Sequence, residues 1–347
     1  MTYTKGTILV TGANGGLGSA TVKRIATSTE LASYHGLYVV RSTSSALTST
    51  LASAEADHTH EILTLDLTSQ SSVRRAAATI NARVATGEIP PIRALVLNAG
   101  FQDFGKQQWL KEADGALDVT FAANYLGHWL LTLLLLQSMD TDKGRIVIVC
   151  SQAHDPLDKR NERTKAFVGQ YETIIHDQSS IDAIAKGTWS ASSEEPGFRS
   201  GYRRYGASKL FLVMMIHSLQ TRLDRDPSLS KICILGVDPG TMSTGLQRHA
   251  IWFIRVLLFK VIYPFIAWLQ PNGPIRTTKR SAEDIVRAAF DHGPGLGEEP
   301  KGVYLDGAVL RETGEESRDA QKRDWVWKES VRLTGLKDDE VALVDWQ

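Results

Sequence analysis

Two residues in the second half of the chain, Tyr205 and Lys209, have the types and spacing of an acid/base pair. Residues four apart lie on the same face of a helix, so their side chains can meet. A nearby ammonium favours phenolate and lowers the pKa of a tyrosine below its ordinary value of about 10. The pair could therefore transfer a proton near neutral pH. Because this spacing is common, it indicates a catalytic pair only together with the motifs around it.

A glycine-rich turn near the N-terminus is a candidate phosphate site. The apolar run Thr7–Thr11 predicts a strand, and it leads into Gly12, Gly16 and Gly18 in the pattern Gly-x-x-x-Gly-x-Gly. Glycine permits a tight turn and a close approach of the backbone to a pyrophosphate, and a helix that begins here would point its free amides at the phosphates. The sequence therefore predicts dinucleotide binding, with a simple turn as the alternative.

The loop after the second expected strand indicates which dinucleotide binds. NAD-binding folds usually place an acidic residue about 20 positions beyond the glycines, to hold the ribose hydroxyls. Here no Asp or Glu occurs from Leu31 to Ala54, and Arg41 is followed by the hydroxyl residues 42–45. A guanidinium and hydroxyls suit a 2′-phosphate. The loop therefore predicts NADP(H), with a solvated loop arginine as the alternative.

Strand-like runs alternate with helical patterns along the chain. This order favours an α/β fold, a Rossmann-like doubly wound parallel sheet with helices on both faces, in a single domain over residues 1–347. A helix is expected to begin near Ser281 as its N-cap, and Pro227 is expected to end another. The expected strands are 7–11, 37–41, 62–65, 94–97, 145–150, 232–237 and 302–305. Besides the helix that begins near Ser281, the expected helices are 16–28, 70–86, 113–138, 202–225 and about 316–333.

The composition narrows the class of protein. Lys plus Arg and Asp plus Glu both number 39, which gives no polybasic surface for nucleic acid. Cys150 and Cys233 lie in apolar runs, so we expect buried thiols, no disulfide and no cysteine-only zinc site. A first strand that begins at Thr7 leaves no room for a signal peptide. We therefore expect a cytoplasmic protein without a metal.

A strongly apolar segment covers about residues 249–271. Arg255, Lys260 and Pro264 within it argue against a transmembrane helix. Our main interpretation is a lid over an apolar substrate pocket. The alternative is a peripheral contact with a membrane interface, such as that of the endoplasmic reticulum, because Trp252 and basic residues suit that zone. The stretch 271–280 is expected to be a loop.

Taken together, the motifs resemble the short-chain dehydrogenase/reductase family, most closely its NADPH-using retinol-dehydrogenase-like and fungal secondary-metabolism members. The resemblance covers about residues 5–245 well and the rest loosely. The matching pieces, in order, are Thr11-Gly-x-x-x-Gly-x-Gly18, Asp66-Leu67, Asn98-Ala99-Gly100, Asn124-Tyr-Leu-Gly-His128, Ser151 after a strand, Tyr205-x-x-x-Lys209 and Pro239-Gly240.

The resemblance implies a role for each catalytic position. Tyr205 would be the general acid that protonates a carbonyl oxygen, and Ser151 would hold that oxygen. Lys209 would bind the nicotinamide ribose and lower the pKa of Tyr205, and Asn124 would anchor a water that links Lys209 to solvent. His154 nearby is interpreted as a solvated loop residue without a role. The expected cofactor-binding residues are Gly12, Asn14, Gly16, Leu17, Gly18, Arg41, Asp66, Leu67, Asn98, Ala99, Gly100, Tyr205, Lys209, Pro239, Gly240, Met242 and Thr244.

One departure from the family pattern concerns the spacing of the catalytic residues. Ser151 and Tyr205 lie 54 positions apart, whereas many family members have about a dozen residues between them. Residues 155–200 are therefore interpreted as an insertion over the active-site entrance, with a surface decoration as the alternative. The pair Cys150-Ser151 replaces the usual Ser-Ser, and we expect the second residue to be catalytic.

The expected function is that of an NADPH-dependent oxidoreductase that transfers a hydride between the cofactor and a carbonyl or alcohol of a small apolar substrate, in secondary metabolism. One alternative is a membrane-associated 3-ketosteroid or retinoid-type reductase. The other is a non-catalytic NADP(H)-sensing protein, against which the complete Ser151, Tyr205 and Lys209 set argues.

Overall fold

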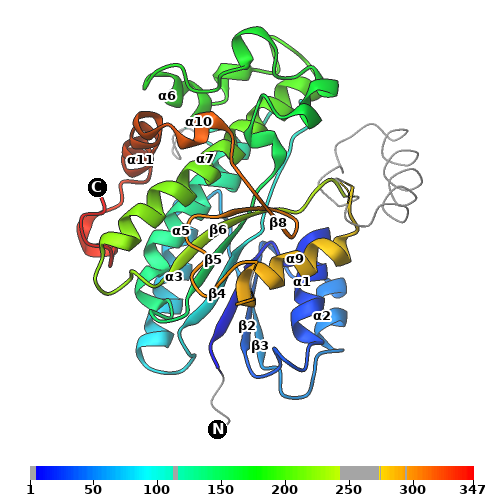
Figure 1. Cartoon of the computed structure of the whole chain (residues 1–347), viewed down its shortest axis with the longest axis vertical. Coiled ribbons are helices and arrows are strands. Elements are labelled where there is room, and N and C mark those ends of the chain that lie inside the picture. The colour runs from blue at the N-terminus through cyan, green and yellow to red at the C-terminus, as the bar shows by residue number, and fades with distance from the viewer. Residues whose placement is uncertain (1–4, 112–115, 243–272, 274, 294) are drawn as a thin grey trace.

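The computed structural model describes residues 5–111, 116–242, 273, 275–293 and 295–347. They form one eight-stranded sheet of order β3-β2-β1-β4-β5-β6-β7-β8, in which only the last pair is antiparallel (Figure 1). This order confirms the expected doubly wound α/β fold. The strands are β1 (Thr7–Thr11), β2 (His35–Val40), β3 (His60–Thr64), β4 (Ile92–Leu97), β5 (Arg145–Val149), β6 (Cys233–Asp238), β7 (Tyr304–Asp306) and β8 (Val309–Arg311).

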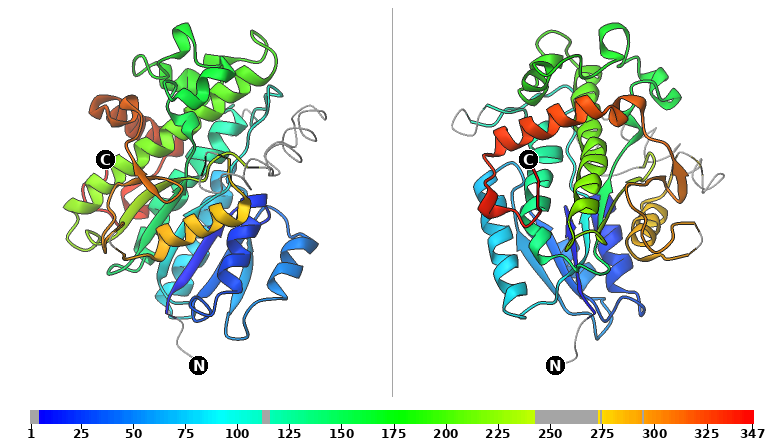
Figure 2. Two further views of the ribbon diagram at one scale, coloured as in Figure 1. Left: turned by 45° about the vertical axis from the view of Figure 1, so that its right-hand side comes forward. Right: turned by 60° about the vertical axis from the view of Figure 1, so that its left-hand side comes forward.

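Helices cover both faces of the sheet (Figures 1 and 2). Ile8 and Val10 of β1 pack into the core under one helical layer, whereas Leu9 packs into the core on the opposite face. This alternation follows from the period of two residues in a strand, and it explains why a central strand is apolar throughout. One layer holds α1 (Gly16–Ala26), α2 (Ser45–Leu51) and α9 (Thr278–Phe290), and the other holds α3 (Gln70–Ala85), α5 (Gly127–Leu135) and α7 (Phe198–Arg225).

The helix before β5 is irregular. It begins with α4 (Val119–Phe121), passes through a π-helical turn over Ala122–Leu126, continues as α5, and ends in a 3₁₀ turn. Among the described residues, the stretch Val119–Ser138 is the one helix that is long and apolar enough to cross a bilayer, and most of it is buried inside the protein. Such burial is typical of the core helix of a globular domain.

Two further helices near the C-terminus lie against α7. They are α10 (Glu315–Arg318) and α11 (Ala320–Thr334). The indole of Trp327 on α11 meets that of Trp129 edge to face, with ring centroids 5.3 Å apart. Both side chains are almost fully buried, so α11 completes the core on this face of the sheet.

The insertion packs against the first half of α7 rather than extending into solvent. It contains α6 (Ser180–Ala185) and several 3₁₀ turns, and lies beyond the sheet at the top of Figure 1. Ile174 and Ile175 are completely buried, and their amides donate to the carboxylate of Glu316 on α10. These contacts anchor the insertion to the core, while its expected place over the active-site entrance stays a prediction.

Several boundaries differ from the sequence-based expectations. The N-cap of α9 is Thr277, whose hydroxyl accepts from the amide of Arg280 at 3.2 Å, so the expected cap at Ser281 is wrong and the loop ends before residue 280. Helix α4 begins later than expected because Asp118 caps it. The short elements α2 and β8 were not expected, since neither has a clear period. The apolar segment 249–271 and Thr244 lie outside the described residues.

Candidate active site

The expected site residues gather at the carboxyl ends of four neighbouring strands. Gly12 follows β1, Asn98 follows β4, Ser151 follows β5 with one residue between, and Pro239 follows β6. In an open parallel sheet this edge is where ligands bind, at the point where the strand order reverses. That reversal lies between β1 and β4, so the fold brings the glycine turn and the catalytic candidates to one edge.

The glycine turn has the features that a pyrophosphate requires. Gly12 has a φ of 67°, and a Cβ at this position would lie 2.7 Å from the Cα of Ala99. Helix α1 begins at Gly16 without a side-chain cap, and its first turn holds no acidic residue. The first amides of the helix are therefore available to an anion, and the helix dipole favours negative charge there. The residues of this turn fit a dinucleotide cofactor.

A buried histidine shapes the turn that contains Asn98. The hydroxyl oxygen of Thr11 accepts from the amides of Asn98 and Ala99 at 2.9 and 3.0 Å, and lies 3.0 Å from Nε2 of His128. Nδ1 of His128 lies 2.9 Å from the carbonyl oxygen of Asn124, which can only accept, so Nδ1 carries the proton. Burial lowers the pKa of His128 to about 4, which keeps the ring neutral.

Asn124 lies in the π-helical turn and joins two segments of the site. Its side chain accepts from the amide of Phe101 at 2.7 Å and donates to the carbonyl oxygen of Phe101 at 2.9 Å. The same amide group donates to the hydroxyl of Ser208 at 3.0 Å. Asn124 therefore ties the loop after β4 to α7, one residue before Lys209. Its expected part in a water chain stays a prediction.

Tyr205, Lys209 and Ser151 are brought together, as expected. Tyr205 and Lys209 lie one turn apart on α7 and are both buried, and the ammonium lies 5.6 Å from the centroid of the Tyr205 ring. Ser151 forms a hydrogen bond with the side chain of Tyr205. Nζ of Lys209 donates to the carbonyl oxygen of Val149 at 2.7 Å, which fixes the lysine against the end of β5.

The pKa of Tyr205 moves in the direction opposite to the one expected. Burial raises it, and the hydrogen bond with Ser151 only partly offsets this effect. Burial also lowers the pKa of Lys209 to about 8, against the opposing influence of Cys150 and Asp238. Desolvation of the phenolate is thus the largest influence on the pKa of Tyr205. The hydroxyl of Tyr205 is protonated at neutral pH and can act as a hydrogen-bond donor and general acid.

The loop expected to hold a 2′-phosphate lies directly beside the glycine turn. Arg41 follows β2 and is exposed to solvent. The side chain of Asn14, within the glycine turn, donates to the carbonyl oxygen of Ser42 and accepts from the hydroxyl of Ser44 at 2.9 Å. Ser44 in turn caps α2. Asn14 therefore couples the phosphate turn to the loop that carries Arg41.

The remaining cofactor candidates lie on the loops after β3 and β6. Asp66 is exposed, and its carboxylate accepts from the amide and hydroxyl of Thr68 at 3.0 and 2.8 Å. Gly240 has a φ of 74°, which glycine adopts without strain, and Met242 is buried. The hydroxyl of Ser281 donates to the carbonyl oxygen of Pro239 at 2.7 Å. Direct contacts of these residues with a cofactor stay predictions.

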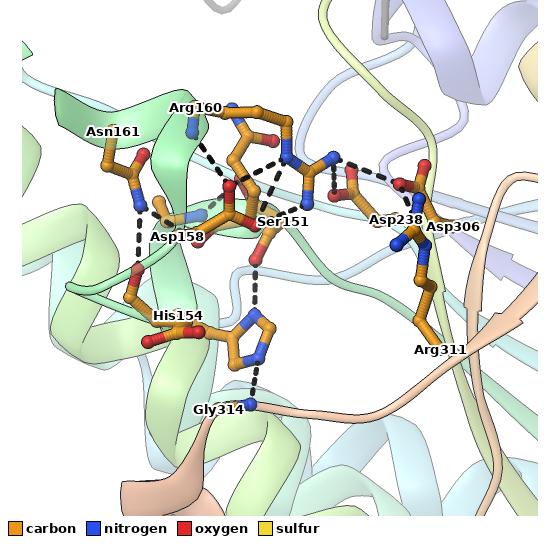
Figure 3. A network of polar contacts seen from close by, with 12 residues as sticks. Ser151, His154, Asp158, Arg160, Asn161, Asp238, Asp306, Arg311 and Gly314 are labelled. Atoms are coloured by element: carbon orange, nitrogen blue, oxygen red, sulfur yellow. Dashed lines mark hydrogen bonds and ion pairs between the residues drawn. The ribbon is translucent and has the colours of Figure 1, made fainter. Parts of the chain in front are cut away.

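His154 is not the solvated residue that the sequence suggested. It is 4% exposed, and its Nε2 accepts from the amide of Gly314 at 3.0 Å, which places the ring proton on Nδ1 (Figure 3). Nδ1 then donates to the carbonyl oxygen of Ser151 at 2.8 Å. Burial lowers the pKa of His154 and so favours this neutral form. The expectation is wrong because the chain near Gly314 covers the loop after β5.

Sequence reasoning also missed a buried ion pair next to Tyr205. The guanidinium of Arg204 donates to Oδ2 of Asp103 at 2.7 and 3.2 Å and lies 3.4 Å from Oδ2 of Asp118. All three side chains are almost completely buried. The pair holds the start of α7 against the loop after β4, so it positions the helix that carries Tyr205. The signal available was the run Arg203-Arg204 directly before the tyrosine.

Comparisons with known proteins identify the relatives of this chain. The family model for short chain dehydrogenases matches residues 6–159. The chain is 43% identical to the short-chain dehydrogenase iccH of Talaromyces variabilis, over 99% of each protein, and 29% identical to the polyprenol dehydrogenase of Mus musculus, over 97% of this chain and 86% of that protein. The angucycline C-6 ketoreductase LanV, solved with bound NADP, superposes with a TM-score of 0.56 at 17% identity, over 89% of this chain and 95% of LanV.

Proposed function

We propose that this chain, which belongs to the short-chain dehydrogenase family, is an NADPH-dependent reductase of a carbonyl group in an apolar substrate. The observation that carries the proposal is the meeting of Ser151, Tyr205 and Lys209 at the sheet edge that also holds the glycine turn. A protein that only sensed the nucleotide would have no need of a proton donor there.

The chemistry divides between the cofactor and the chain. The reduced nicotinamide, when bound, supplies the hydride. Tyr205 supplies the proton to the carbonyl oxygen, and its raised pKa keeps that proton available at neutral pH. The hydroxyl of Ser151 is the second donor to the same oxygen. Two fixed donors at an oxygen that gains negative charge stabilise the transition state, in the manner of an oxyanion hole.

Lys209 has N–H donors that remain available for the cofactor. An ammonium carries three N–H donors, and the carbonyl oxygen of Val149 occupies one of them. The other two are assigned to the hydroxyls of the nicotinamide ribose. His154 acts on the same reaction by holding the backbone of Ser151, so that its hydroxyl keeps its place beside Tyr205.

NADPH is proposed over NADH because Arg41 stands where an acidic residue would accept from the ribose hydroxyls. The exposed guanidinium can form two parallel bonds to a phosphate. The presence of NADP in the ketoreductase LanV supports this choice.

An apolar substrate is proposed from the apolar sequence of the segment 249–271 and from the polyprenol named for the mouse relative. A biosynthetic place in secondary metabolism is proposed from the fungal relative and the ketoreductase.

The test is NADPH oxidation by the purified full chain over a panel of apolar ketones, each paired with a polar ketone of similar size. We expect oxidation that depends on the ketone, that is faster with the apolar member of a pair, and that is lost in Tyr205→Phe. Tight NADPH binding without turnover of any ketone, or of any alcohol with NADP⁺, would refute the proposal in favour of a sensor.

A further inference from the structure

A cluster of charged side chains joins the insertion to the turn after β6 (Figure 3). Its centre is Arg160, in the 3₁₀ turn Lys159–Thr164 near the start of the insertion. The guanidinium binds both carboxylate oxygens of Asp158, with its shortest bond at 2.6 Å. Its remaining nitrogen reaches Oδ2 of Asp238 at 3.3 Å and Oδ2 of Asp306 at 3.1 Å. One arginine thus serves three carboxylates from three separate segments.

Asp238 is the member that touches the candidate cofactor site. It is the last residue of β6 and only 1% exposed. Its Oδ1 accepts from the amide of Gly240 at 2.9 Å, while its Oδ2 faces Arg160. The carboxylate therefore shapes the turn Pro239-Gly240 with one oxygen and is oriented through the other. Arg160 sets that orientation, although it belongs to a segment 78 residues earlier in the chain.

A second arginine fixes the same turn from the other side. Arg276 donates to Oδ1 of Asp306 at 2.7 Å and to the carbonyl oxygen of Asp238 at 3.2 Å, and its amide donates to the carbonyl oxygen of Thr241 at 2.9 Å. With Arg311 at 3.9 Å from Asp306, three guanidinium groups balance three carboxylates. The cluster therefore holds the backbone on both sides of the turn. Burial raises the pKa of Asp238 and Arg160 opposes that shift, so without Arg160 the carboxylate carries an uncompensated charge wherever it is ionised.

The uncompensated charge of Asp238 would lie close to Tyr205 and Lys209. The negative charge of Asp238 already raises the pKa of both Tyr205 and Lys209. Arg160 forms an ion pair with the carboxylate of Asp238 at 3.3 Å. Two further cations lie nearby, since Arg276 contacts the carbonyl oxygen of Asp238 and Lys209 is influenced by its charge. The titratable and charged groups that face Asp238 are Cys150 after β5, His154 in the following turn, Arg160 in the insertion, Tyr202, Tyr205 and Lys209 on α7, Arg276 before α9, and Tyr304 and Asp306 on β7.

We propose that Arg160 is a positioning residue for the reaction proposed above: by holding Asp238 it couples the insertion to the nicotinamide-side turn and neutralises a buried carboxylate next to Tyr205. The proposal rests on the proposed function for its catalytic part alone. The insertion then has a function in the site, because it carries the arginine that orients Asp238 and, through Asp238, the turn Pro239-Gly240.

The test compares Arg160→Met with Arg163→Met. Arg163 lies in the same 3₁₀ turn but is exposed, so its substitution controls for changes in the turn itself. NADPH affinity is measured by titration. Alcohol oxidation with NADP⁺ is measured across pH, because in that direction Tyr205 must lose its proton. Arg160→Lys and the double variant Arg160→Met/Asp238→Asn complete the set.

We expect Arg160→Met to weaken NADPH binding about tenfold or more, because the turn Pro239-Gly240 loses a charge-assisted hydrogen bond that orients it. We also expect the pH at which oxidation becomes active to rise, because the unpaired carboxylate opposes ionisation of Tyr205. Asp238→Asn in the same background removes that charge and should bring the pH profile back, and Arg160→Lys should retain part of the affinity. Arg163→Met should behave as wild type in both measurements.

Equal NADPH affinity in wild type and Arg160→Met, with an unchanged pH profile, would overturn the proposal. The proposal also fails if both arginine variants lose affinity equally, or if the double variant keeps the shifted profile. Should Arg160→Met fail to fold, the affinity and pH profile of Arg160→Lys decide instead. A wild type that binds NADPH but turns over no substrate would refute the proposed function, while the affinity comparison would still decide the role of Arg160.

Discussion

Replacing Tyr205 with phenylalanine removes one hydroxyl and leaves the ring in place. The ring packs against Tyr202 at a centroid distance of 6.3 Å and against the ammonium of Lys209 at 5.6 Å, and both contacts survive the substitution. Among the described residues, the interaction lost is the hydrogen bond with Ser151. Such a bond contributes about 0.5–1.5 kcal/mol to stability, so the free energy of unfolding should change by no more than that.

Turnover should fall much further. A positioned general acid contributes roughly 10²–10⁴ in rate, which corresponds to about 2.7–5.4 kcal/mol in the activation free energy. The assay is steady-state NADPH oxidation with the best ketone of the panel, beside urea unfolding and NADPH titration. We expect kcat to collapse while the unfolding curve and the cofactor affinity stay near wild type.

Tyr202→Phe is the matched control. Tyr202 lies one turn earlier on the same face of α7, but its hydroxyl donates to Oδ1 of Asn161 in the insertion at 2.8 Å, away from the reacting oxygen. Its kcat should stay within about tenfold of wild type, because it loses only a structural hydrogen bond. Turnover of Tyr205→Phe within a few-fold of wild type, or equal losses in the two variants, would show that the reasoning about the proton donor is wrong.

Three further substitutions and one double substitution test other parts of the argument. Wild type should favour NADPH over NADH by about ten- to a few hundred-fold in kcat/KM, and Arg41→Asp should reverse that order; a wild type that favours NADH contradicts the cofactor assignment. Arg204→Met leaves two buried carboxylates without their cation and should cost about 3–5 kcal/mol in urea unfolding, whereas a loss below about 1 kcal/mol would mean the pair is not needed. Burial lowers the pKa of His58 from 6.5 to about 4, so the unfolded state binds more protons than the folded state between these pH values. The free energy of unfolding should therefore fall by up to about 3 kcal/mol as pH drops through that window. His58→Gln should flatten this dependence, and an unchanged slope would exclude His58 as its cause. Trp252→Ser with Phe253→Ser should raise KM for an apolar ketone if the segment is a lid. Release of the protein from membrane fractions would instead support the interfacial alternative. If neither effect is observed, both interpretations are wrong.

The parts of the fold that sequence predicted are those encoded locally. The apolar run of β1, the glycines after it and the periodic pattern of α7 each lie within a short stretch, so their signals can be read without knowing the tertiary structure. Tyr205 and Lys209 meet because they share one helix, and that too is local. The resemblance to a family then supplied the order of the remaining motifs, including Ser151.

The interactions that sequence did not predict join residues far apart in the chain. His154 is buried because the chain near Gly314 closes over it, 160 residues later. Arg160 and Asp238 meet across 78 residues, and charged residues in a polar segment are normally solvated. Nothing in the local pattern of the insertion distinguishes an arginine that enters the site from one that faces water, so these contacts required the structure.

The π-helical turn around Asn124 changes the directions in which side chains point before and after it along one helix. A π turn accommodates an extra residue, and each residue of an α-helix advances about 100° around its axis. Upstream of the turn, Asp118 faces Arg204; downstream, His128 reaches Thr11 and Trp129 enters the core. A deletion of Ala123 would make the helix more regular and at the same time rotate one half against the other, so the two sets of contacts could not be satisfied together. The irregular geometry is therefore what allows a single helix to serve both the core and the catalytic helix beside it.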